Sequence, residues 1–85
     1  MVEPQQYLTS DTPLAAFLIQ AGHTLFEICY ETKPNGKKQG VFIFLPDETL
    51  QADINLYNQG RATINLAIYE HIKAGLLDRI MRGLP

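Results

Sequence analysis

The chain has 85 residues, of which 46% are hydrophobic and 19% are charged. This length fits one domain and excludes a two-domain enzyme with a cleft between its lobes. The hydrophobic share excludes disorder over most of the chain. The formal net charge of −2 disfavours a dedicated nucleic-acid module, because such modules are usually basic. No apolar run approaches the roughly 20 residues that cross a bilayer, so no membrane contact is expected.

We expect a flexible lead-in over residues 1–6 and a single domain over residues 7–85. Cys29 is the only cysteine, and one thiol cannot form an internal disulfide. Small secreted domains usually depend on disulfides, so the sequence favours a reducing, cytoplasmic setting.

The first two predicted elements are a short strand over residues 7–9 and a helix over residues 13–21. Thr12 is the expected N-cap, and Pro13 fits the first helical position, where a missing N–H costs nothing. Apolar residues cover nearly all sides of this helix, which indicates burial on most of them. Gly22 ends the helix in the position that glycine usually takes there.

Two strands joined by a hairpin turn follow. Alternation over residues 24–32 predicts a strand, and the turn at residues 33–38 contains Asn-Gly, which tolerates the positive φ of tight hairpins. Residues 39–45 are apolar on both faces and predict the central strand of a small sheet. The alternation assigns one face of the first of these strands to Thr24, Phe26, Ile28 and Tyr30.

Two helices complete the predicted domain. Asp47 is the expected N-cap of the first, Glu48 complements its dipole, and Asp53 falls on its solvent side. Asn65 is the expected N-cap of the second, over residues 66–82. The core stripe of this last helix comprises Tyr69, Ile72, Leu76 and Ile80, flanked by Leu66, Ile68 and Leu77. The order β-α-β-β-α-α predicts a small two-layer α+β domain, with three helices on a short antiparallel sheet of about three strands.

The side chains that could hold a metal or act as a nucleophile are His23, Cys29 and His71. They lack the close spacing of a zinc site, and a structural zinc site needs about four ligands. Capping explains Asp47 and Glu48 without catalysis. We expect the helix dipole or a backbone carbonyl to stabilise His23, and we expect His71 to be solvated. The sequence therefore predicts no catalytic residue, metal ligand, cofactor or small-molecule ligand, and no enzyme.

Basic side chains gather at the hairpin turn, which holds Lys33, Lys37 and Lys38. A basic hairpin can contact phosphates, and Arg79 and Arg82 join it if the last helix ends on the same side. These five residues are the candidate nucleic-acid contacts. The alternative is a solubilising turn that protects the strand ends from edge pairing.

Gly75 interrupts the last helix at a cost of about 1 kcal/mol relative to alanine. A close crossing by another helix, within the chain or in a second chain, would explain a glycine there. Gly75 and His71 are the candidate interface residues.

A longer pattern runs through the chain. It reads Y-x-T-x-D-x-x-L-A-A-x-L-x-x-x-G-H over residues 7–23 and continues with Phe42-x-Phe44, Tyr57-x-x-Gly60 and Tyr69. In this pattern the chain resembles a family of small bacterial and phage domains of unknown function. The resemblance implies a stand-alone domain, often encoded by phages or mobile elements, in the cytoplasm of a bacterium or of an infected host cell. It carries over no catalytic residue.

Three functions remain open from the sequence. The first is a non-catalytic interaction module of a phage, mobile-element or bacterial assembly, which binds a protein partner or itself. The second is a nucleic-acid-associated accessory protein that uses the basic hairpin tip. The third is a small metal-dependent or hydrolytic enzyme, which requires His23, Cys29 or His71 to converge with carboxylates in a pocket.

Overall fold

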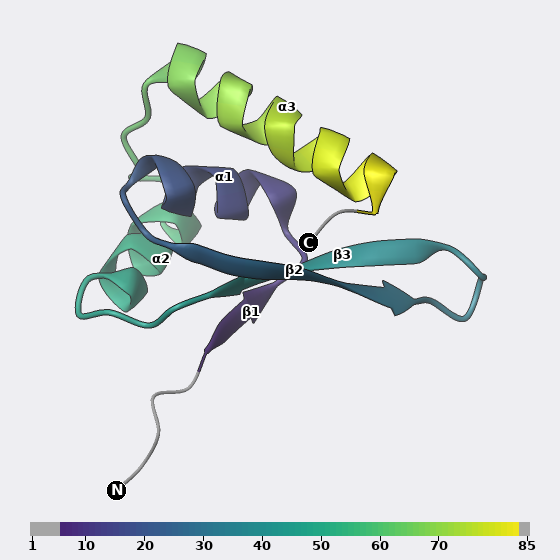
Figure 1. The fold of residues 1–85 in the computed structure, drawn as a ribbon. Coiled ribbons are helices and arrows are strands. Elements are labelled where there is room, and N and C mark those ends of the chain that lie inside the picture. The colour runs from purple at the N-terminus through teal and green to yellow at the C-terminus, as the bar shows by residue number, and fades with distance from the viewer. Residues whose placement is uncertain (1–5, 84–85) are drawn as a thin grey trace, which may run out of the picture.

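The computed structural model describes residues 6–83, so the predicted lead-in lies outside the described residues except for Gln6. Its elements, in chain order, are β1 (Tyr7–Thr9), α1 (Thr12–Gln20), β2 (Leu25–Thr32), β3 (Lys38–Phe44), α2 (Leu50–Asn58) and α3 (Leu66–Arg82). The strands form one antiparallel sheet in the order β1-β3-β2, and α1 lies between this sheet and α3 (Figure 1). The predicted α+β class and element order are confirmed. Within the described part of the chain, no helix combines the length and the apolarity needed to cross a membrane.

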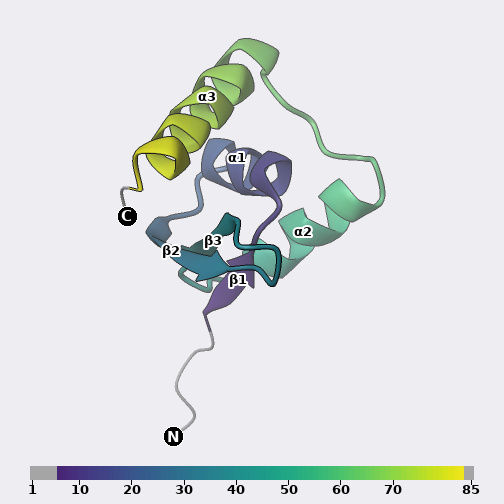
Figure 2. The ribbon, with the colours of Figure 1, turned by 90° about the vertical axis from the view of Figure 1, so that its right-hand side faces the viewer.

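The central strand is β3, as its two apolar faces predict. It pairs with β1 through residues 42–44 and with β2 along its whole length. Phe42 and Phe44 have no exposed surface and belong to the main hydrophobic core on the helix side of the sheet. None of the helices in residues 6–83 lies on the opposite face of the sheet (Figures 1 and 2).

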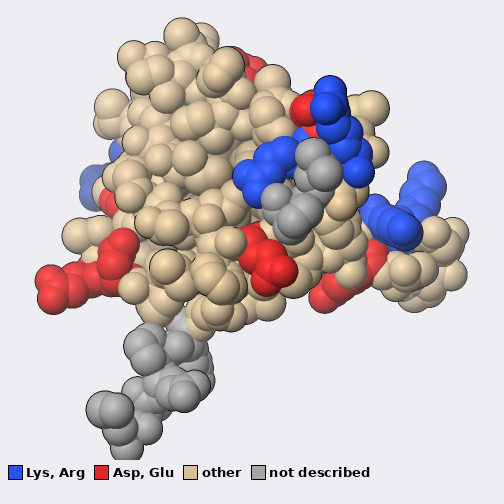
Figure 3. Space-filling model, in the orientation of Figure 1, with Lys and Arg blue, Asp and Glu red and all other residues tan. Residues whose placement is uncertain are grey.

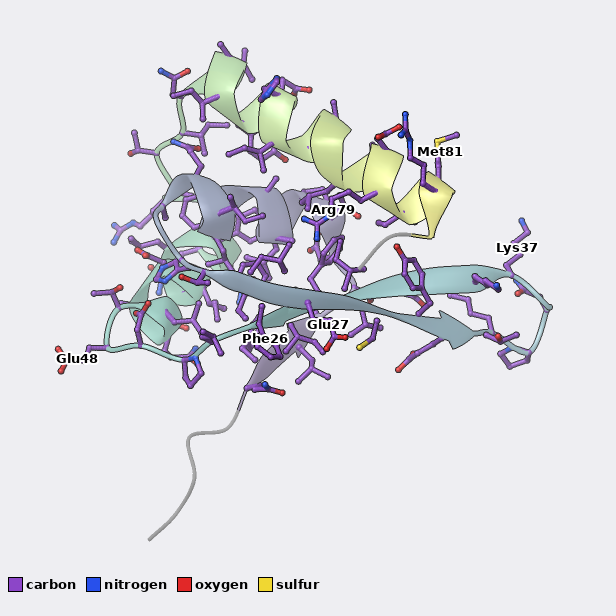
Figure 4. All side chains as sticks on the ribbon, viewed as in Figure 1. Phe26, Glu27, Lys37, Glu48, Arg79 and Met81 are labelled. Carbon is purple, nitrogen blue, oxygen red and sulfur yellow. The ribbon has the colours of Figure 1, made fainter. Side chains whose placement is uncertain are left out.

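A β-bulge near the start of β2 corrects the predicted alternation. Leu25 pairs with Phe44 and Glu27 with Ile43, so Phe26 is one extra residue between these pairs. Leu25 packs against the core, whereas Phe26 is 57% exposed. Phe26 and Glu27 both point to the uncovered face of the sheet (Figure 4). The prediction that Phe26 shares a face with Ile28 is therefore wrong, because one inserted residue reverses the alternation that precedes it.

Helix α1 is apolar on most sides because it is enclosed. The sheet lies on one side of it, α3 on another and α2 beside it (Figure 2). Its N-cap is Asp11, whose Oδ1 accepts a hydrogen bond from the Leu14 N–H at 3.2 Å, so the predicted cap at Thr12 is wrong by one residue. Gly22 follows the helix at φ 101°, and the predicted stop is confirmed.

The C-terminal end of α3 rests on the sheet. A Cβ on Gly40 of β3 would lie 3.0 Å from the Ile80 side chain, so any other residue here would require that side chain to shift. The Tyr30 hydroxyl donates a hydrogen bond to the Arg79 carbonyl at 3.1 Å. At the other end, Asn65 Oδ1 accepts from the Ile68 N–H, and the predicted cap is confirmed.

Candidate functional site

One cluster of titratable side chains forms around His23, in the tight turn between α1 and β2. The imidazole is 2% exposed. Its Nδ1 lies 2.9 Å from Oδ2 of Asp47, and its Nε2 lies 2.6 Å from Oδ2 of Asp53. Asp47 belongs to the loop between β3 and α2, and Asp53 to the first turn of α2. The ring therefore ties the turn after α1 to the start of α2, and we call these three residues the His23 clamp.

The clamp holds a charged imidazole. An ionised carboxylate only accepts hydrogen bonds, so both ring nitrogens donate and both carry a proton. Burial opposes this charge and lowers the pKa of His23, but the hydrogen bonds and negative charges of Asp53 and Asp47 outweigh it and raise the pKa above its ordinary 6.5. Hydrogen bonds from His23, the Thr49 hydroxyl and the Thr49 N–H lower the pKa of Asp47 to about 2.

The clamp corrects two sequence predictions. The N-cap of α2 is Thr49, without a side-chain cap, while Asp47 Oδ1 accepts from the Thr49 N–H at 2.8 Å and from its hydroxyl at 2.9 Å. Asp53 is not on the solvent side, because its side chain is 24% exposed and bonded to His23. Glu48 is exposed and points away from the protein (Figure 4).

Sequence reasoning missed the clamp because its members lie 24 and 30 residues apart. Helical periodicity reports which side of α2 a residue occupies, and it does not report which distant turn reaches that side. The available signal was a histidine directly after a glycine helix stop, together with an excess of acids at the start of another helix.

The clamp ties together two segments that are distant in the sequence. Both nitrogens are taken and the ring is sealed from solvent, so it has no free site for a substrate. Cys29 is a free, partly buried thiol on β2, and His71 is exposed on α3. Among residues 6–83, no group of His, Cys, Asp and Glu side chains is arranged to hold a metal ion.

The basic residues partly converge. Lys38 and Arg82 line one hollow of about 370 Å³ with Tyr30, at the side where α3 ends against β2 and β3. Blue side chains gather at this end of the molecule, with acidic ones between them (Figure 3). Arg82 Nε lies 3.2 Å from Asp78, so part of its charge is already balanced. Lys37 lies at the hairpin, away from the hollow (Figure 4).

A second exposed feature is apolar and runs along α3. Leu66 is 64% exposed, Leu77 45% and Met81 87%. Spacings of 11 and 4 residues place them within about 60° around the helix axis, and we call them the outer α3 stripe. Met81 points away from the protein body (Figure 4). The prediction that Leu66 and Leu77 flank the core stripe is therefore wrong, because both side chains are exposed. The sequence signal for this separate stripe is the four-residue step from Leu77 to Met81.

The candidate interface residues lie on another side of α3. Gly75 and His71 are exposed, and a Cβ on Gly75 would meet no described atom of another segment within 4 Å. A close helix crossing within the chain therefore does not explain this glycine. A contact of Gly75 or His71 with a second chain stays a prediction.

Next to the start of α3 lies an apolar hollow of about 240 Å³. Its lining residues are Phe17, Tyr57, Gly60, Ala62, Ile64 and Tyr69. The rings of Phe17 and Tyr57 stack inside it with centroids 5.7 Å apart. Burial, the nearby Asp11 charge and Tyr69 raise the pKa of the Tyr57 hydroxyl. We call this feature the Tyr69 hollow.

Comparison of the chain with protein families, with curated proteins and with solved structures gives no match. The family resemblance drawn from the sequence therefore stays a prediction.

Proposed function

We propose that this protein is a non-catalytic interaction module that binds a protein, either a partner or a second copy, through the outer α3 stripe. The observation that carries the proposal is the exposure of Leu66, Leu77 and Met81 on one side of α3. Exposed apolar surface rimmed by polar residues is typical of protein contacts, and methionine is enriched there. A role in a phage, mobile-element or bacterial assembly belongs to the same proposal and rests on the family resemblance.

The exclusion of catalysis in this proposal rests on the chemistry of the His23 clamp. This cluster joins distant segments, and its histidine nitrogens both bind carboxylates. Two ion pairs among the described residues, Lys73 with Glu70 and Arg82 with Asp78, lie within single turns of α3. Such pairs are surface features of a helix and not catalytic arrangements.

A charge placed in the stripe tests the function. Leu77→Glu introduces a carboxylate into the apolar contact, and Ile68→Glu makes the same kind of change on the opposite side of α3, where Ile68 is 51% exposed. We expect Leu77→Glu to abolish association, and Ile68→Glu to retain it. The measurements are sedimentation velocity over a concentration series and capture of proteins from native lysate on immobilised chain. A monomer whose captured proteins are the same for both variants would contradict the proposal.

A second candidate function is contact with nucleic acid at the basic end. It is favoured by the hollow that Lys38 and Arg82 share. It predicts salt-sensitive binding to DNA or RNA that is lost in the double variant Lys37→Glu, Lys38→Glu. Absence of binding at about 50 mM salt, where phosphate contacts are favoured, would exclude it.

A further inference from the structure

Two apolar features lie at opposite ends of α3, and each is open to contact by another chain. Met81 places a long, flexible apolar side chain in solvent at the C-terminal end, 87% exposed. The Tyr69 hollow is a concave, mainly apolar site at the N-terminal end. Leu66 and Met81 are separated by about 22 Å of helix, so Met81 cannot reach the hollow of its own chain. A second copy that runs in the opposite direction along α3 brings the two together.

The stripe and the Tyr69 hollow lie on adjacent sides of α3. Tyr69 lines the hollow, and the Lys73 ammonium lies over its ring, 5.4 Å from the centroid. At about 100° per residue, Tyr69, Lys73 and Leu66 fall within about 60° around the helix axis. Leu66 thus lies on the stripe about 60° from Tyr69, which lines the hollow, so a helix docked on the stripe passes close to the hollow.

In one antiparallel register, the exposed residues on this side of α3 face residues of matching polarity in the second copy. When Leu66 lies opposite Leu77 of the second copy, a step of four residues places Glu70 opposite Lys73. Because α3 begins at Leu66, Met81 of the second copy reaches about 6 Å past its N-terminal end, toward the preceding segment, whose Ala62 and Ile64 line the Tyr69 hollow. Apolar residues therefore face apolar residues, and an acidic side chain faces a basic one. The parallel arrangement instead stacks Glu70 on Glu70 and leaves each Met81 away from the hollow.

Building on the proposed function, we propose that the protein bound at the outer α3 stripe is a second copy of this chain, paired antiparallel along α3, with Met81 of each copy seated in the Tyr69 hollow of the other. The arrangement has a two-fold axis between residues 71 and 72, so each contact occurs twice. Glu70 and Lys73 already lie 3.4 Å apart within one helix. The two-fold axis brings the two pairs together as a four-charge network at the centre of the interface, which fixes the register.

The charges of Glu70 and Lys73 allow a charge-swap experiment, and only pairing between two chains gives its expected result. Glu70→Lys leaves two lysines at the centre of each helix, and Lys73→Glu leaves two glutamates. We expect each variant alone to weaken the dimer about tenfold or more, because like charges then face each other twice. Mixed in equal amounts, the two variants are expected to form a heterodimer of near wild-type affinity. Sedimentation equilibrium measures the dissociation constants, and circular dichroism checks that each variant is folded.

A mixture that stays monomeric while both variants are folded would overturn the proposed register. Met81→Asp tests the hollow separately, since it leaves the central charges in place. We expect it to weaken self-association about tenfold or more. Unchanged affinity would remove Met81 from the interface.

The two proposals fail in different ways. One outcome separates them: the wild-type chain is monomeric up to about 1 mM, but it captures a different protein that Leu77→Glu no longer captures. In that case the proposed second copy is wrong, and the proposed interaction module stands. If self-association and capture are both indifferent to Leu77→Glu, both proposals are wrong.

Discussion

His23 shows how one side chain can join segments far apart in sequence. Its ring is sealed between the carboxylates of Asp47 and Asp53, so removing either acid leaves a buried positive charge with half its partners. Loss of one partner of a buried ionic contact usually costs more than the intact contact contributes. The tie between the turn after α1 and the start of α2 therefore depends on His23 keeping both carboxylate partners.

Stability should depend on pH with a maximum in the mildly acidic range. The pKa of His23 is raised, so its contribution is fully present below 6.5 and is lost as pH rises through the raised pKa. The pKa of Asp47 is lowered, so its contribution is present above 3.8 and is lost as pH falls towards about 2. We expect the free energy of unfolding to be largest between about pH 4 and 6.5.

Urea denaturation at a series of pH values measures this profile. His23→Gln is neutral over the whole range and should remove the decline on the alkaline side. His71→Gln is the matched control, since His71 is exposed on α3, and it should keep the decline. A wild-type stability that does not fall as pH rises above 6.5 would show that His23 is not held as a cation, because a raised pKa places the loss of its proton above that pH.

Helix α3 is positioned by a few specific contacts at its C-terminal end. The Tyr30 hydroxyl bonds the Arg79 carbonyl, and Ile80 lies against the backbone of Gly40. The sequence predicted the bounds and the N-cap of this helix correctly, because Asn65 caps it through a local side chain. It did not predict the contact between Gly40 and Ile80, because these residues are 40 positions apart in the sequence.

A side chain at Gly40 should push α3 away from the sheet. Gly40→Val would bring a branched side chain against Ile80, which already lies 3.0 Å from the position of a Cβ. We expect a loss of about 1–3 kcal/mol in the free energy of unfolding. Ile80→Ala makes room at the same place, so the cost of Gly40→Val should shrink in that background. Additive costs in this double-mutant cycle would show that the two residues do not meet.

The molecule as a whole has one core to which helices and strands all contribute. The largest fully buried side chains come from β3 and α1, and the single fully buried residue of α3 is Leu76, 3% exposed. An 85-residue domain has a free energy of unfolding of about 5–10 kcal/mol. One well-packed residue is therefore a large part of the total.

Loss of Leu76 should affect every element at once. Leu76→Ala leaves a cavity between α3 and α1 and should cost about 2–5 kcal/mol. We expect helix circular dichroism and tyrosine fluorescence to report the same, lower urea midpoint, because the core is shared. Leu77→Ala is the matched control, since Leu77 is 45% exposed, and it should change the midpoint little. Two separate transitions in Leu76→Ala would show that α3 unfolds independently.

The sequence by itself determined the α+β class, the element order, the central strand and the N-cap of α3. These features depend on local signals: periodicity, turn residues such as Asn-Gly, and a capping side chain three residues from its acceptor. Only the tertiary structure decided the bulge at Phe26, the His23 clamp and the exposure of the outer α3 stripe. Each of these depends on which distant segment lies opposite a residue, and periodicity within one element carries no information about that.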